Sequence, residues 1–199
     1  MLVVDQSMRA REHAVLRAMF AARKRVFVDL LKWDLPVLAG RFEVDHRDGP
    51  DATYLIVAGP EGEHRASARL LPIRSAGASR AEECLPDGVA GAPGIAEVTH
   101  FCVSPDIGGN ERRRARDQLL HGLVDHALAR SIHCLVGVAE EPWARRAEGF
   151  GWACRRLGTA RTSCGRDMVT MAVDIDRSTP ERLVAVGIVR PLARRQALR

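Results

Sequence analysis

The chain has 199 residues, which is enough for one domain with a sizeable core, and we expect residues 1–199 to form a single domain. Hydrophobic residues make up 46% and charged residues 28%, as in ordinary soluble proteins, and no apolar stretch is long enough to span a membrane. The formal charge of +5 favours acidic partners, which include nucleic acid, a phosphate-bearing small molecule and an acidic protein.

Hydrophobic periodicity and turn residues predict the elements in chain order. We expect a helix over residues 8–31, strands over 53–59 and 65–73 joined as a hairpin, and a strand over 96–104. Next come a helix over 110–131 with Asn110 as its N-cap, a strand over 132–139, a helix over 141–151 and a strand over 167–175. A last helix opens with Thr179 as its N-cap and Pro180 at its first position. This order predicts an α/β fold, a three-layer α-β-α sandwich with a mixed sheet and helices on both faces.

Three other features of the sequence bear on the function and the cellular location of the protein. The segment 74–94 is rich in Gly, Ala and Pro, and its length predicts a connection with a functional role, as a lid or a docking surface. The start of the chain shows no secretory signal. The cysteines are odd in number, widely spaced and without a Cys-x-x-Cys pair, which predicts reduced thiols, a cytoplasmic protein and no metal site. They are Cys84, Cys102, Cys134, Cys154 and Cys164.

Arg23 interrupts the apolar stripe of the first predicted helix, since apolar residues stand four positions before and after it. A buried charge is costly unless it has a partner. The segment FEVDHRD, residues 42–48, supplies Glu43, Asp45 and Asp48 soon after the helix. We expect Asp45 and Asp48 to meet Arg23, and a solvated acidic loop is the alternative.

Two more charged residues fall within predicted strands. Arg69 lies on a semi-polar face of its strand, for which an exposed strand arginine is the alternative. Glu97 begins a strand with apolar neighbours, and a carboxylate partly removed from water can be tuned into a general base. A solvated glutamate at the edge is the alternative. Strict alternation places on the face of Glu97 the side chains of Thr99, Phe101 and Val103.

The stretch CVSPDIGGNERRRARDQLL, residues 102–120, has the strand–turn–helix layout with which N-acetyltransferases hold the pyrophosphate of acetyl-CoA. The glycine-containing phosphate turn typical of those enzymes is missing here. The helix start instead carries an arginine cluster that can meet an acidic protein or a phosphate, with a solvated helix turn as the alternative. The cluster consists of Arg112, Arg113, Arg114 and Arg116.

Taken as an ordered set, these residues resemble a known family, the acyl-homoserine-lactone synthases, which are the autoinducer synthases of bacterial quorum sensing. The matching pieces are Arg23-x-x-x-Phe27, Trp33, Glu43-x-Asp45-x-x-Asp48, Arg69-Leu-Leu-Pro and Glu97-x-Thr99. The resemblance extends from about residue 8 to about residue 175, nearly a whole domain. The fold of this family is similar to the N-acetyltransferase fold, in agreement with the layout above.

The resemblance implies a reaction. Members of the family transfer an acyl group from acyl-acyl carrier protein, or in some cases from acyl-CoA, to the amino group of S-adenosylmethionine. The methionyl part then forms a lactone, and methylthioadenosine is released. S-adenosylmethionine is thus a substrate, and no cofactor is implied.

The resemblance also implies roles for individual residues. The S-adenosylmethionine pocket and its ion-pair network are formed by Arg23, Phe27, Trp33, Asp45, Asp48 and Arg69. We expect Glu97 to take the proton from the amine, directly or through a water, and backbone N–H groups at 101–103 to stabilise the thioester oxygen. The acyl chain is expected along segments 134–139 and 168–173. If the donor is a carrier protein, the arginines at 112–116 are expected to dock it.

One position departs from the family pattern, since His100 stands where an arginine is usual. We expect His100 to replace that arginine only while protonated, with a strand bulge that brings it to Glu97 and raises its pKa. Three alternatives remain. A small-molecule N-acetyltransferase using acetyl-CoA is disfavoured by the missing phosphate turn. A basic nucleic-acid-binding domain is disfavoured by 5% aromatic residues and the lack of a recognition motif, so we expect no nucleic-acid partner. The third alternative is a related protein that binds ligand without turnover.

Overall fold

The computed structural model describes residues 1–73, 92–158, 161–163 and 166–190, and the statements below refer to these parts of the chain. Most of the predicted connection 74–94 lies outside them, as do Cys84 and Cys164, so the lid or docking role of that connection stays a prediction. Cys102, Cys134 and Cys154 are free thiols. None of the described helices is both long and apolar enough to cross a membrane.

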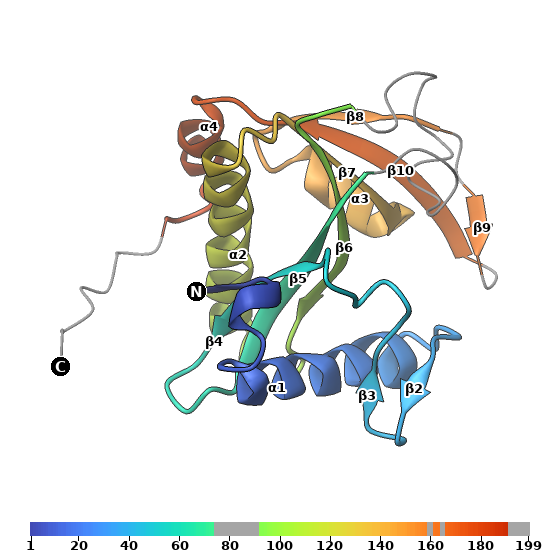
Figure 1. The fold of residues 1–199 in the computed structure, drawn as a ribbon. Helices are drawn as coiled ribbons and strands as arrows, with labels where there is room; N and C mark the ends of the chain where they lie inside the picture. Colours follow the sequence, from blue (N-terminus) through green and yellow to red (C-terminus); the bar gives the residue numbers. More distant parts are fainter. Residues whose placement is uncertain (74–91, 159–160, 164–165, 191–199) are drawn as a thin grey trace, which may run out of the picture.

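The centre of the fold is an eight-stranded sheet with the order β1-β4-β5-β6-β7-β10-β8, and β9 pairs with β10 (Figure 1). Its first strands are β1 (Leu2–Val4), β4 (Thr53–Ala58), β5 (His64–Pro72) and β6 (Ile95–Val103). The other strands are β7 (Cys134–Glu140), β8 (Ala153–Arg156), β9 (Arg161–Ser163) and β10 (Arg166–Asp174). Only β6 and β7 are parallel to each other, so the sheet is mixed, as predicted.

Helices cover both faces of this sheet. They are α1 (His13–Arg23), α2 (Gly109–Ala129), α3 (Glu141–Glu148) and α4 (Thr179–Ala185). Alternate residues of β4 divide between two cores: Leu55 and Val57 pack with α2 and α3, whereas Tyr54 and Ile56 pack with α1. A short hairpin, β2 (Val37–Leu38) with β3 (Phe42–Glu43), lies beside α1 (Figure 1). The predicted three-layer α-β-α sandwich is confirmed.

The first helix differs from the prediction at both ends. A separate 3-10 turn covers Gln6–Met8, the α-helix begins only at His13, and the last part, Lys24–Leu30, is π-helical. The amide of Leu31 donates to the carbonyl of Val26, five residues back, at 2.9 Å. Such wider turns are rare and are frequent at functional sites. The predicted caps are also wrong: Gly108 caps α2 in place of Asn110, and Ser178 precedes α4 in place of Thr179.

The parallel pairing of β6 with β7 is short. It joins Ile95 to Cys134 and ends where Glu97 faces Val136. At Gly137 the two strands are still so close that a Cβ would lie 3.0 Å from the carbonyl oxygen of Val98. Beyond this point the described part of β6 pairs with β5 alone, so the sheet opens between β6 and β7.

A β-bulge changes the faces of β6. Thr99 pairs with Arg69 and Cys102 pairs with Ser67, so two residues, His100 and Phe101, stand opposite a single residue of β5. His100 has a φ of +51°, in the left-handed region that a side chain rarely adopts. The alternation predicted from the sequence is therefore wrong beyond Thr99.

After the bulge, Phe101 and Val103 pack with the core on the side of α2. Their predicted place on the face of Glu97 is thus wrong. The bulge expected at His100 is present, but it brings His100 to Phe27 and Glu43 on the side of α1. One extra residue in the strand causes both changes.

Candidate active site

Arg23 is buried at the end of α1 and is held by two acids. Its side chain is 1% exposed, and its Nε donates to Oε2 of Glu43 at 2.5 Å. Its two terminal nitrogens donate to Oδ1 and Oδ2 of Asp48 at 2.8 and 3.1 Å. Two parallel bonds of this kind are among the stronger polar contacts in proteins. Every N–H-bearing nitrogen of Arg23 is therefore in use.

Arg69, on β5, forms the second half of the network. Its Nη1 donates to Asp45 at 2.6 Å and to Asp48 at 2.7 Å, and its Nη2 donates to Asp45 at 2.9 Å. Its Nε donates to the hydroxyl of Thr99 at 2.9 Å. Asp48 thus bridges both arginines, and the alternative of an exposed strand arginine is wrong, since the Arg69 side chain is 2% exposed.

The expected partners of Arg23 are therefore half correct. Asp48 meets it as predicted, but Glu43 takes the place of Asp45. Glu43 ends β3, which packs on α1, so its side chain reaches the helix directly. Asp45 begins the following turn, in which its amide donates to Asp48 at 2.8 Å, and it faces Arg69 on β5.

The network carries more acids than bases. Three carboxylates, those of Glu43, Asp45 and Asp48, face the two guanidiniums of Arg23 and Arg69. Burial raises the pKa of each carboxyl. For Asp45 and Asp48 the arginines outweigh burial, and for Glu43 the contact with His100 and that with Arg23 do so, which holds all three pKa values below their usual range. The acids are therefore ionised, and one negative charge remains unbalanced.

His100 adds to this network from the bulge. Its Nε2 lies 3.4 Å from Oε1 of Glu43, and its ring stands edge-on to Phe27 at 5.2 Å between centroids. Burial lowers the pKa of His100 below its usual value, and the contact with Glu43 offsets this only in part. His100 is thus neutral near pH 7. The expectation that it meets Glu97 and has a raised pKa is wrong.

Glu97 is buried on β6 and has a partner that sequence analysis missed. Its residue is 3% exposed, and its Oε2 accepts from Nη2 of Arg47 at 2.5 Å. The loop fixes this arginine, because the amide of Arg47 donates to Oδ1 of Asp45 at 2.8 Å. Arg47 lies in the acidic segment between Asp45 and Asp48, where the sequence drew attention to the acids alone.

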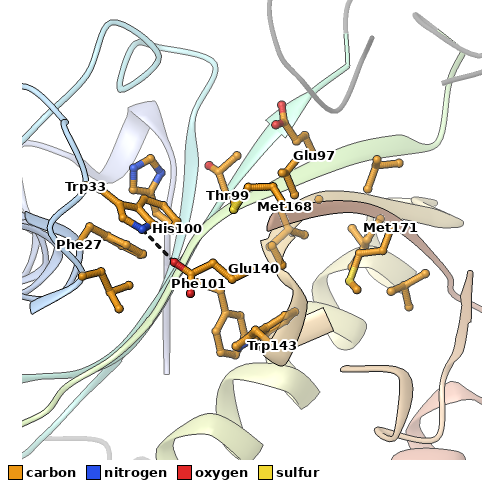
Figure 2. Close-up of a pocket in the computed structure, with 18 of the residues that line it drawn as sticks. Phe27, Trp33, Glu97, Thr99, His100, Phe101, Glu140, Trp143, Met168 and Met171 are labelled. Carbon is orange, nitrogen blue, oxygen red and sulfur yellow. Dashed lines mark hydrogen bonds between the residues drawn. The ribbon is translucent and has the colours of Figure 1, made fainter. Parts of the chain in front are cut away.

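A cavity of about 680 Å³ opens between β6 and β7. Figure 2 shows Phe27 and Trp33 at the left, Met171 at the right, and Thr99 and Glu97 of β6 between them. The Phe27 and Trp33 rings lie 5.1 Å apart, and Nε1 of Trp33 donates to Oε1 of Glu140 at 3.1 Å. This bond links the end of the first helix to the end of β7 across the cavity.

Six of the predicted site residues line this cavity, whereas Arg23, Asp45, Asp48 and Arg69 form the ion-pair network beside it. The residues that line it are Phe27, Trp33, Glu97, Thr99, His100 and Phe101. Val103 lies in the core on the side of α2 instead. The predicted chain-binding segments supply Leu135–Ala139, Met168, Met171 and Val173. Leu123, Glu140, Trp143 and Trp152 also line it, and periodicity alone gave no signal that these residues meet there.

The arginines at the start of α2 lie apart from this cavity and differ from one another. Arg112 and Arg114 are exposed, and Arg113 donates to the carbonyl of Gly187 at 3.3 Å. Arg116 is half-buried, donates to Asp117 at 2.5 Å and lies over the ring of Phe150 at 5.4 Å. Arg116 therefore supports the fold, as expected for at least one member of the cluster.

Glu43, Asp45 and His100 place ligand atoms within 4.8 Å of one another, which is a spacing that a metal ion can use. Their carboxylates already bind Arg23 and Arg69, and a cation would have to displace these guanidiniums. The charges of the site thus favour ion pairs over a metal.

The layers, the bulge in β6 and the opening between β6 and β7 define a class, the proteins of the N-acetyltransferase fold. A putative N-acetyltransferase from Lactobacillus plantarum has a TM-score of 0.59 at 18% identity, covering 86% of this chain and 96% of that chain. This similarity concerns the fold.

Comparison with known families narrows the class. Residues 7–183 match the model of the autoinducer synthase family. The acyl-homoserine-lactone synthase of Ralstonia nicotianae is 30% identical over 186 residues, covering 88% of each chain. A CoA-dependent acyl-homoserine lactone synthase, BjaI, solved with SAM and isopentyl-CoA, has a TM-score of 0.79 at 25% identity, covering 96% of this chain and 89% of that chain. The chain belongs to the autoinducer synthase family, the acyl-homoserine-lactone synthases.

Proposed function

We propose that this protein transfers an acyl group from a thioester to the amino group of S-adenosylmethionine and releases an acyl-homoserine lactone and methylthioadenosine. The observation that carries this proposal is the cavity itself. Glu97 lies between an aromatic end beside the ion-pair network and an apolar end between β7 and β10. A polar cationic substrate and a hydrocarbon chain can thus meet at one carboxylate.

The aromatic end suits S-adenosylmethionine. The sulfonium is a cation, and a cation is attracted to the face of an aromatic ring. Phe27 and Trp33 supply two such rings, whose centroids lie 5.1 Å from each other. The unbalanced negative charge of the ion-pair network also attracts the sulfonium cation. In this proposal Arg23, Asp45, Asp48 and Arg69 hold the walls of the pocket in place, with no need to touch the reacting atoms.

The chemical step requires a base, because a protonated amine is not a nucleophile. Glu97 is the proposed base, since it is buried on β6 and lines the cavity. The amine then attacks the thioester carbonyl, whose oxygen gains negative charge, and the carbon–sulfur bond breaks to release the free thiol of the donor. The Thr99 hydroxyl accepts a hydrogen bond from Arg69, so its own proton is free to be donated to that oxygen, beside backbone N–H groups at 101–103.

The acyl donor is held by chemistry that CoA and carrier proteins share, a phosphopantetheine arm ending in the thioester. The acyl chain lies along the apolar wall formed by Leu135, Val136, Met168 and Met171. If the donor is a carrier protein, the exposed arginines of the cluster dock its acidic surface. We propose that the whole chain, residues 1–199, works as one domain in the cytoplasm, where both substrates are made.

The test is a reaction with purified protein, S-adenosylmethionine and one acyl group carried either on CoA or on carrier protein. The proposal predicts methylthioadenosine release in step with acyl-homoserine lactone formation for at least one donor, and the better donor is identified by its kcat/KM. Acetyl transfer from acetyl-CoA to another amine, without methylthioadenosine, would overturn it in favour of an N-acetyltransferase.

A further inference from the structure

Three guanidiniums lie in or beside the site, and two of them are fully used. The Nε and both terminal nitrogens of Arg23 donate to Glu43 and Asp48. The same three nitrogens of Arg69 donate to Asp45, Asp48 and Thr99. Both side chains are almost completely buried. Neither arginine can bind a further anion without giving up a partner.

Arg47 is different. Within the described residues, only its Nη2 has a side-chain partner, Oε2 of Glu97, and its side chain is 18% exposed against 4% for Glu97. Its backbone is fixed by the bond from its amide to Asp45, and its guanidinium contacts Glu97, which lines the cavity. Four of its five N–H groups therefore remain available to a ligand.

A carboxylate that enters the cavity needs such a cation. Among the residues that line the cavity in the described part of the chain there is no lysine or arginine, and the charged ones are Asp34, Glu97 and Glu140. Arg47 meets the cavity through Glu97 and carries the positive charge at that point.

We infer that Arg47 binds the α-carboxylate of S-adenosylmethionine and that the Arg47–Glu97 pair recognises the amino-acid head of this substrate; the inference rests on the proposed function. The α-amino and α-carboxylate groups are attached to one carbon, so they must meet opposite charges that lie side by side. A guanidinium 2.5 Å from a carboxylate offers that arrangement. A carboxylate bound to Arg47 places the amine against Glu97, the proposed base.

The test compares three ligands by calorimetry: S-adenosylmethionine, its decarboxylated analogue and methylthioadenosine, which lacks the amino-acid head. We expect the wild-type protein to bind S-adenosylmethionine about 10- to 100-fold more tightly than the decarboxylated analogue, because the analogue lacks one hydrogen-bonded contact between charged groups. Arg47→Gln should lose this preference and bind methylthioadenosine as the wild type does. Arg47→Lys should retain part of the preference, because it keeps the charge.

Arg41→Gln is the matched control, since Arg41 is an exposed arginine of the same region that lies against Phe42. It should leave all three affinities unchanged. A wild-type protein with equal affinity for S-adenosylmethionine and its decarboxylated analogue overturns the inference, even if Arg47→Gln does not fold. An Arg47→Gln variant that keeps the preference also overturns it, and in both cases the proposed function stands. If the wild type does not bind S-adenosylmethionine, both fail.

Discussion

Arg23 and Asp48 form a two-point ion pair inside the protein, with 2.8 Å between Nη1 and Oδ1 and 3.1 Å between Nη2 and Oδ2. The side chains are 1% and 2% exposed. Asp48 also accepts from Arg69 and from the hydroxyl of Tyr54. The carboxylate of Asp48 thus connects the end of α1 to β4 and β5, and the ion-pair network of the site depends on it.

Arg23→Ala should lower the free energy of unfolding by about 3–5 kcal/mol, because it leaves Glu43 and Asp48 buried without this partner. Asp45→Asn should cost less, because Asp48 still binds Arg69. Chemical denaturation measures both values. Arg25→Ala is the control, since Arg25 is 57% exposed and its pair with Asp106 should be worth at most about 1 kcal/mol. Equal losses for Arg23→Ala and Arg25→Ala would contradict the buried network.

Glu97→Gln should reduce turnover roughly 100-fold or more, because the amide has the same shape but cannot take a proton. The fold should persist, since Arg47 is partly exposed and can turn to water. Steady-state kinetics with both substrates measure the loss, and circular dichroism checks the fold. Asp106→Asn, at an exposed carboxylate, should keep normal turnover. Near-normal activity in Glu97→Gln would remove Glu97 from the mechanism.

His100 makes stability depend on pH in a direction that follows from its lowered pKa. In the unfolded chain its pKa is near ~6.5, so below that pH the unfolded state binds a proton that the folded state resists. Stability should therefore fall as the pH is lowered from about 7 toward the folded pKa, and above pH 7 it should not depend on this group.

The measurement is the free energy of unfolding at pH 7 and pH 5 for the wild type and for His100→Asn. The variant should lose less stability between the two values. His64, whose pKa burial lowers to about 4, gives a parallel comparison through His64→Asn. A wild type and a His100→Asn variant with the same pH dependence would show that His100 titrates normally in the folded protein.

The exposed arginines of α2 allow a test of the donor. Arg112→Glu with Arg114→Glu should raise the KM for acyl-carrier protein severalfold and leave the KM for S-adenosylmethionine unchanged, because a carrier protein is acidic. The KM for acyl-CoA should change less, since CoA presents no protein surface. Arg116→Gln should instead lower stability, through Asp117 and Phe150. Equal effects on both substrates would contradict docking at this helix.

Much of the fold followed from local pattern. The hairpin of β4 and β5 and the strands β6, β7 and β10 lie within one or two residues of their predicted ranges, since long apolar runs between turn residues leave few choices. The short strands β1, β2 and β3 were missed, because two or three residues are too few to show the alternation of apolar and polar side chains that marks a strand. Pairing with a neighbour defines them, and no local pattern shows it.

The site was predicted in composition better than in geometry. Burial of Arg23 was expected from its place in an apolar stripe, and the structure confirms it. The partners depended on how the loop at 43–48 folds, which put Glu43 on Arg23 and Arg47 on Glu97. The bulge at His100 was expected, but its register is set by the pairing of β6 with β5. The sequence of β6 alone therefore did not reveal the faces that Phe101 and Val103 take after the bulge.

The account is tested most directly by mass spectrometry of the medium of cells that express this chain, with cells expressing Glu97→Gln as the control. We expect acyl-homoserine lactones from the wild type, carrying isotope label supplied in methionine, and a loss of roughly 100-fold or more in the variant. Medium free of labelled acyl-homoserine lactones, from cells shown to contain folded wild-type protein, would contradict the account.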